Sequence, residues 1–217
     1  MATGSRRTLD PALQVLLTAY AAGGLDLPMS ALVASHLILS RRSRAFVARW
    51  EAAHGAAVEA AEPMALPNRE RALRSILASG DDGVRARGVH AGGTEGALPP
   101  PLRRFLGFDL DQAPWRPVLP GLRECLVEQE PAEVRLISIA AGRSMPPHRH
   151  DGAEAMLVLR GGFRDGGRFR RGDVAVIGGQ VAHGALADPD EDCVCFAVTD
   201  PSPCWVEGTD RPVPGCP

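Results

Sequence analysis

The chain has 217 residues, with 24 basic and 26 acidic side chains and a formal net charge of −2. This length accommodates one large domain or two small ones, each able to bury a core. The balanced charge provides no broad basic field, which argues against direct contact with nucleic acid or an anionic membrane. The apolar stretches are too short to span a bilayer and no signal peptide opens the chain, so we expect a cytoplasmic protein.

The first third of the chain is rich in Ala, Leu, Arg and Glu, which favours helix. A first helix is expected to start at Pro11, after Asp10, and to stop at the Gly-Gly pair 23–24. A second helical stretch opens at Pro28 and ends near His54, with an interruption around residues 40–43. A further short helix is predicted in the stretch NRERALRSILAS. These elements predict a small all-α unit.

Gly and Pro crowd residues 80–101, which predicts a flexible linker. Beyond it, short apolar runs such as EVRLISIA, AEAMLVLRG and DCVCFAVTD alternate with Gly, Pro and Asp. This pattern is typical of an antiparallel sandwich or barrel. The expected organisation is a helical domain at residues 8–80, a linker at 81–100, an all-β domain at 101–206 and a tail at 207–217.

The five cysteines all lie in the second half of the chain, and their odd number does not fit a secreted disulfide framework. Cys193 and Cys195 are two residues apart in a predicted strand, so their side chains are expected on the same face. Two small buried residues are the simpler interpretation, and a redox or metal role is the alternative.

A group of histidines predicts a metal site in the second half. His148 and His150 are separated by one residue, so an extended chain would point both imidazoles to the same face. Glu154 opens the next predicted strand and adds an anionic oxygen, and His183 follows the strand GDVAVIGG. Three nitrogens and one carboxylate suit Zn²⁺, Mn²⁺, Fe²⁺ or Ni²⁺ better than Ca²⁺ or Mg²⁺. We expect these four residues to be the metal ligands, with Zn²⁺ as the first candidate.

The spacing of these residues resembles the two motifs of the cupin superfamily. It reads Gly142-x5-His148-x-His150-x3-Glu154-x6-Gly161, followed by Gly172-x10-His183. In cupins the three histidines and the glutamate are the metal ligands, and the fold is a double-stranded β-helix jelly roll. The chain departs from the second motif at Gly178, where a proline is usual. That proline belongs to a turn, so the expected ligand set is unchanged.

The helical half resembles a zinc-binding anti-sigma domain, most clearly in LLTAYAAG at residues 16–23. Together with a C-terminal cupin, this resembles the ChrR family of cupin anti-sigma factors. The resemblance implies an extracytoplasmic-function (group IV) sigma factor as the partner of the helical domain. It also implies that a metal-bound cupin senses an oxidant or a small molecule.

The family motif His-x3-Cys-x2-Cys, which binds structural zinc, is altered in this chain. Its positions read His36, Ser40 and Ser43, and serine hydroxyls are poor zinc ligands beside thiolates. We therefore expect no zinc in the helical domain, which must rely on apolar packing. The expected core residues are Leu13, Leu16, Leu17, Leu32, Val33, Leu37, Phe46, Val47 and Trp50.

Two alternatives to a regulator remain open. The same ligand set serves cupin dioxygenases and isomerases, in which open metal positions bind substrate. Glu128, Glu130 and Arg135 could supply acid or base chemistry, although surface charges explain them equally well. The second alternative is an interaction protein whose metal only stabilises the β-roll. The two-part architecture favours a regulator over an enzyme.

Overall fold

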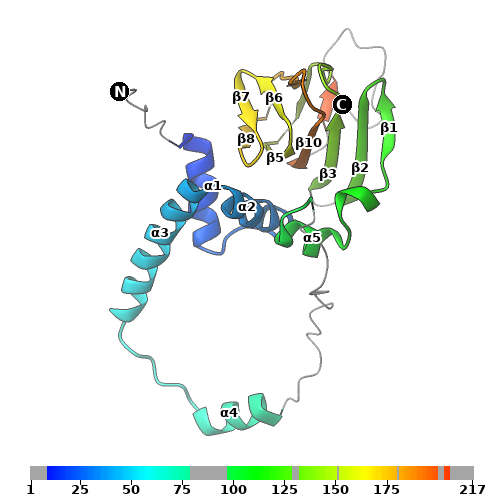
Figure 1. The fold of residues 1–217 in the computed structure, drawn as a ribbon. Helices are drawn as coiled ribbons and strands as arrows, with labels where there is room; N and C mark the ends of the chain where they lie inside the picture. Colours follow the sequence, from blue (N-terminus) through cyan, green and yellow to red (C-terminus); the bar gives the residue numbers. More distant parts are fainter. Residues whose placement is uncertain are drawn as a thin grey trace.

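The structure is a computed structural model that describes residues 9–78, 97–128, 132–150, 152–179 and 181–199, together with the backbone of 203–205. The expected tail at 207–217 and most of the expected linker lie outside these residues. In the described part, helices precede a β-sheet domain, which confirms the expected fold class (Figure 1). No helix in the described ranges is long and apolar enough to cross a bilayer.

The helical part begins with three helices whose starts are capped by side chains. Asp10 accepts hydrogen bonds from the first backbone amides of the first helix, Asp26 caps the second, and Ser40 caps the third. The third helix continues past Gly55, so the expected stop near His54 is wrong. An interior glycine costs a helix only about 1 kcal/mol, and the alanines around it favour continuation. The helices are α1 (Pro11–Ala21), α2 (Leu27–Leu39) and α3 (Arg41–Glu59).

Most of the expected helical core is buried, but Trp50 is not. Its side chain is 39% exposed and lies against the rings of Phe46 and His54 on the outer part of α3. Five of the expected residues are fully buried, namely Leu13, Leu17, Leu32, Val33 and Val47. The apolar face of α3 therefore meets the core only along its first two turns.

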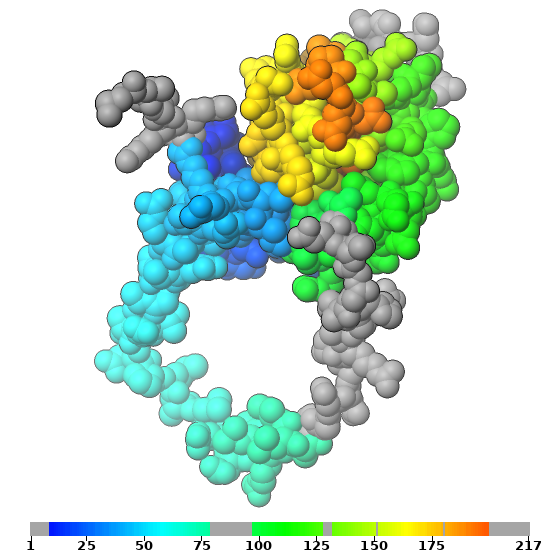
Figure 2. All heavy atoms as spheres, in the orientation of Figure 1, coloured from blue at the N-terminus to red at the C-terminus, as the bar shows by residue number. Residues whose placement is uncertain are grey.

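Helix α4 (Arg69–Ala78) has no buried residue and stands apart from the rest of the molecule (Figures 1 and 2). Helix α5 (Pro100–Leu106) was not expected from the sequence. It is short and starts with consecutive prolines, which suit the first turn of a helix but resemble a linker. It packs against α2, and a 3₁₀ turn follows at Leu110–Gln112.

Within the described residues, the β domain contains three antiparallel sheets. The largest has the strand order β1-β2-β3-β10-β5-β8, and smaller sheets have the orders β7-β6-β9 and β11-β4. The strands are β1 (Arg116–Leu119), β2 (Leu122–Glu128), β3 (Glu133–Ile139), β4 (His148–His150), β5 (Glu154–Arg160), β6 (Gly162–Asp165), β7 (Gly167–Arg170), β8 (Val174–Ile177), β9 (Leu186–Ala187), β10 (Cys193–Thr199) and β11 (Pro203–Trp205).

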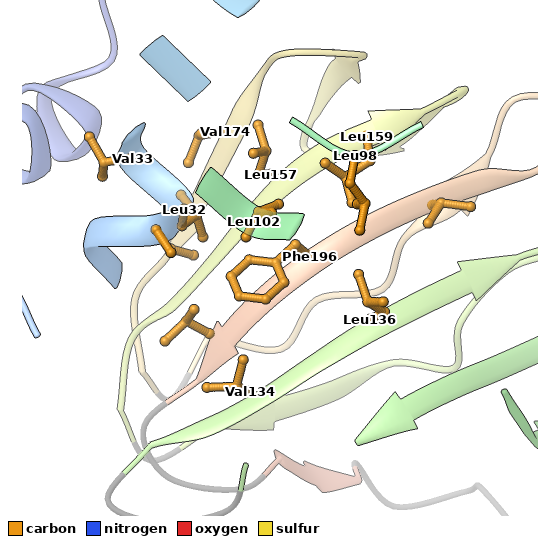
Figure 3. Packing of buried hydrophobic residues seen from close by; sticks show 14 of the residues in the cluster. Leu32, Val33, Leu98, Leu102, Val134, Leu136, Leu157, Leu159, Val174 and Phe196 are labelled. Carbon is orange, nitrogen blue, oxygen red and sulfur yellow. The ribbon is translucent and has the colours of Figure 1, made fainter. Parts of the chain in front are cut away.

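The two faces of the six-stranded sheet have different neighbours. Alternate residues of β3, β5 and β10 point toward the helices, where Phe196 packs with Leu32 of α2 and Leu102 of α5 (Figure 3). The residues between them point into the barrel and form a second apolar cluster with Phe163. The helices and the outer face of the sheet thus share one continuous core, and the barrel interior forms another.

Candidate metal centre

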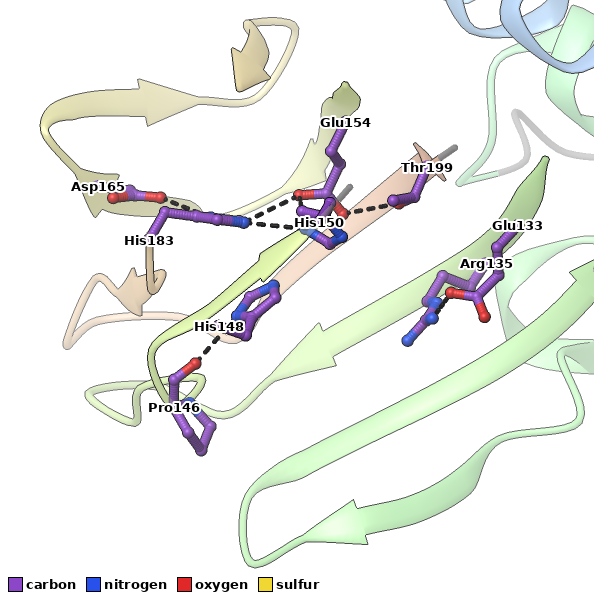
Figure 4. A network of polar contacts seen from close by, with 9 residues as sticks. All are labelled: Glu133, Arg135, Pro146, His148, His150, Glu154, Asp165, His183 and Thr199. Carbon is purple, nitrogen blue, oxygen red and sulfur yellow. Dashed lines mark hydrogen bonds and ion pairs between the residues drawn. The ribbon is translucent and has the colours of Figure 1, made fainter. Parts of the chain in front are cut away.

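The four expected ligands come together at one end of the barrel. His148 and His150 lie on β4, and their side chains point to the same side because they are two residues apart in a strand. Glu154 begins β5, and His183 pairs through its backbone with His148 in an isolated bridge. One donor atom from each side chain lies within 4.8 Å of the others (Figure 4).

The distances between donor atoms suit a common ion. The Nε2 atoms of His150 and His183 are 2.9 Å apart, and Glu154 Oε2 lies 3.4 and 3.7 Å from them. Ligands at about 2.0–2.2 Å from one ion are separated by about 3 to 3.5 Å in tetrahedral or octahedral geometry. The close approach of two nitrogens is therefore better understood as convergence on a cation than as a hydrogen bond.

Three of the four candidate ligands also form hydrogen bonds on the side that faces away from the centre of the site, and the sequence analysis did not predict these partners. His183 Nδ1 donates to Asp165 Oδ2 at 3.0 Å, and His148 Nδ1 donates to the Pro146 carbonyl at 3.0 Å. These bonds place the protons on Nδ1, so the Nε2 atom of each ring carries the lone pair that could coordinate a metal. Thr199 donates to Oε1 of Glu154 at 3.0 Å, which leaves Oε2 facing the imidazoles.

The site is buried and its ionisation favours metal binding. All four ligands are at most 6% exposed. Burial lowers the pKa of His148 to about 4, so this imidazole is neutral at physiological pH. Burial by itself would raise the pKa of Glu154, but the close approach of His150, and of His183 and His148 beyond it, holds this pKa below its ordinary value. Neutral imidazoles and a carboxylate are the forms that coordinate metals.

Two buried polar atoms of the site have no hydrogen-bond partner within the described residues, namely Nδ1 of His150 and Oε2 of Glu154. An unpaired carboxylate oxygen in a buried site is costly unless a cation faces it. The donor set therefore fits a divalent transition metal, which would supply Lewis acidity and any further coordination positions.

Of the residues considered for acid or base chemistry, only Arg135 can be placed. It points into the barrel and forms an ion pair with Glu133 (Figure 4). A second ion pair joins it to Glu124 at 3.2 Å. Glu130 lies outside the described residues, and only the backbone of Glu128 is described. Arg135 is thus committed to neighbouring carboxylates.

The two cysteines of β10 point into the barrel as expected. Cys193 and Cys195 are 0% and 3% exposed, and their sulfurs lie 3.7 Å apart. This confirms that both side chains occupy the same face and are buried.

Residues 104–203 match the family model of the ChrR cupin-like domain. The chain is also 36% identical over 187 residues to the anti-sigma-E factor ChrR of Cereibacter sphaeroides, and the alignment covers 85% of this chain and 86% of the relative. The chain belongs to the ChrR family of anti-sigma factors. The identity extends over more than the cupin, so the helical part shares the relationship.

The three-dimensional structure of this ChrR family member supports the same conclusion. It matches a chain in the crystal structure of Rhodobacter sphaeroides SigE in complex with the anti-sigma ChrR, with a TM-score of 0.71 and 35% identity. The match covers 86% of this chain and 96% of that chain. Helices and barrel are therefore arranged on a common plan.

Proposed function

We propose that this protein is an anti-sigma factor that binds an extracytoplasmic-function sigma factor through its helical part. The observation that carries the proposal is the 36% identity to an anti-sigma-E factor along 86% of that relative's length. The structural match to a chain of a SigE–ChrR complex supports it. No direct contact with nucleic acid is needed, in keeping with the net charge of −2.

The outer part of α3, the following segment and α4 expose many apolar side chains, and this region is called the helical arm (residues 50–78). Helices that present unburied apolar residues are typical of surfaces that bind a partner. The most exposed are Val58, Met64, Leu66, Ile76 and Leu77, at 64–93%. We expect the sigma factor to cover them.

We further propose that the cupin is the sensing domain, with a metal held by His148, His150, Glu154 and His183. Four protein ligands at a six-coordinate metal leave two positions for an oxidant or a small molecule. The nitrogen-rich donor set and its burial suit Zn²⁺ first, with Mn²⁺, Fe²⁺ or Ni²⁺ as alternatives. Enzymatic turnover by the same centre is the alternative, and the pairing of Arg135 with two carboxylates argues against it.

The proposal is tested by measuring the affinity of the full-length protein for the sigma factor encoded nearest to its gene. We expect Leu77→Gln on the arm to weaken binding about tenfold, the effect of losing one well-packed interface side chain. The matched control is Leu126→Gln on the cupin strand β2, whose side chain is 41% exposed and should contribute nothing.

The full chain is required because Leu32 and Val33 of α2 pack against the cupin sheet, and removing the cupin would expose them. Absence of a complex, both with and without a chelator, would overturn the anti-sigma proposal. Equal weakening by both variants would place the interface elsewhere.

A further inference from the structure

A buried chain of hydrogen bonds joins the α2–α3 corner to the cupin. His36 is 3% exposed; its Nδ1 lies 2.7 Å from the carbonyl oxygen of Gly172, and its Nε2 lies 2.7 Å from Oγ of Ser43. A carbonyl can only accept, so Nδ1 carries the proton and Nε2 accepts from the Ser43 hydroxyl. The imidazole therefore bridges residues that are distant in sequence.

The series of hydrogen bonds continues from Ser43 to Ser40, at the start of α3. Ser40 donates from its hydroxyl to Oγ of Ser43 at 3.0 Å, and it accepts from the Ser43 amide as the cap of α3. The direction of donation is therefore Ser40 to Ser43 to His36 to Gly172. A buried network in which each bond supports the next is rigid and sensitive to the loss of any member.

The β7–β8 turn, which accepts the last of these hydrogen bonds, lies very close to the end of α2. Gly172 has a φ of +90°, and a Cβ at this position would lie 3.0 Å from the Cβ of Leu39 at the end of α2. A residue with a side chain would be strained there and would push the turn away from the helix. Glycine thus allows the backbone carbonyl to reach His36.

The same turn is fastened to β5, the strand that starts with Glu154. The Gly172 amide donates to the Val158 carbonyl at 2.8 Å, and the Val158 amide donates to the Asp173 carbonyl at 3.0 Å. The following strand, β8, pairs with β5 up to Glu154, which lies opposite Ile177. One strand pair therefore runs from the metal-facing carboxylate to the turn that His36 holds.

We propose that His36, Ser40, Ser43 and the Gly172 carbonyl form a helix–cupin latch through which the metal state of the cupin is transmitted to the α2–α3 corner. The inference deepens the proposed sensing function and rests on it for its biological purpose. Without a cation, Glu154 sits uncompensated among buried imidazoles and the start of β5 loosens. The β5–β8 pair then holds the turn less firmly, and the latch opens more often.

The test is hydrogen–deuterium exchange on the full-length protein, either loaded with Zn²⁺ or treated with a chelator. Removal of the metal should speed amide exchange at residues 36–43 about tenfold, the loss expected for one buried hydrogen bond. In the Zn²⁺-loaded protein, His36→Ala should produce the same increase, and the metal should then have no further effect at residues 36–43.

Three further variants keep the test independent of misfolding. Ser43→Ala removes one hydroxyl and should give a smaller increase at the corner. Gly172→Ala should release the corner, whereas Gly142→Ala, which shares a positive φ but has open space around it, should not. Unchanged exchange at β3 and β10 shows that each variant is folded.

The latch is refuted if chelation leaves residues 36–43 unchanged, or if both glycine variants act alike. No sigma factor enters the experiment. A negative result would therefore leave the anti-sigma proposal standing, and failure of sigma binding would not affect this result.

Discussion

Two of the candidate metal ligands are held by neighbouring side chains through the atoms that face away from the centre of the site. Asp165 holds His183, and Thr199 holds Glu154, each through one hydrogen bond of 3.0 Å. Such partners set the tautomer and ring orientation before a metal arrives, and their loss usually weakens binding without removing a ligand. Asp165 is 18% exposed on its side chain, so its bond with His183 is largely shielded from water.

We predict that Asp165→Ala lowers metal affinity by about 10- to 100-fold, because His183 loses the acceptor that keeps its proton on Nδ1. Competition with a chromogenic chelator at pH 7 measures the change. Asp190→Ala, at an exposed aspartate in a turn, removes the same charge and should leave the affinity unchanged. An equal affinity for both variants would show that Asp165 does not position the ligand.

Among the secondary-structure elements, the α2–α3 corner is joined to the cupin by hydrogen bonds. Its three residues, His36, Ser40 and Ser43, stand where the family resemblance places zinc ligands, and here they hydrogen-bond to each other and to the cupin. The lack of zinc in this corner stays a prediction. Burial lowers the pKa of His36 below its ordinary 6.5, although the Gly172 carbonyl and the charge of Asp173 act in the opposite direction.

We predict that His36 makes the protein less stable in mild acid. Its pKa is lower in the folded than in the unfolded chain, so the unfolded chain binds more protons as the pH falls below 6.5. The free energy of unfolding is therefore unaffected by His36 above pH 6.5. It decreases as the pH falls from 6.5 toward the pKa of His36 in the folded protein, by at most about 1.4 kcal/mol per pH unit.

Thermal unfolding between pH 7.5 and 5 measures this dependence, and His36→Gln should flatten it. The other histidines are the same in both proteins, so the difference between the two curves isolates His36. Parallel curves would contradict the prediction.

At the scale of the whole molecule, the helical part and the cupin share a core. Leu17, Leu32 and Val33 of the helices are fully buried together with Leu157 and Phe196 of the sheet (Figure 3). A perturbation of the sheet therefore reaches the helices across a single layer of side chains. The helical arm, by contrast, has no buried residue, so its apolar side chains are available to a binding partner.

We predict that Leu32→Ala destabilises the whole protein by about 2–5 kcal/mol, because it leaves a cavity between α2 and the sheet. Differential scanning calorimetry should show one transition that moves as a unit. Leu77→Ala, at a residue that is 81% exposed on the arm, should change stability by less than about 0.5 kcal/mol. Two transitions, with only one shifted by Leu32→Ala, would contradict a shared core.

Features that depend on local pattern are predictable from the sequence alone. The start of the first helix follows from Asp10 and Pro11, and the strands follow from short apolar runs between turns. The shared face of His148 and His150 was predictable from their spacing in an extended chain, and the resemblance to the cupin motifs added Glu154 and His183 to the candidate ligands. The buried pair Cys193 and Cys195 follows from the same alternation.

Contacts between distant segments become visible only in the folded molecule. Asp165 lies in an ordinary turn pattern, and no local signal shows that it reaches His183. The amphipathic pattern predicts Trp50 as a core residue, but α3 extends away from the core after Val47. His36 matches one position of the altered zinc motif, and no local pattern shows that it hydrogen-bonds to the carbonyl of Gly172, 136 positions further along the sequence. These contacts arise from the packing of the helices on the sheet, which long-range burial sets and local pattern does not encode.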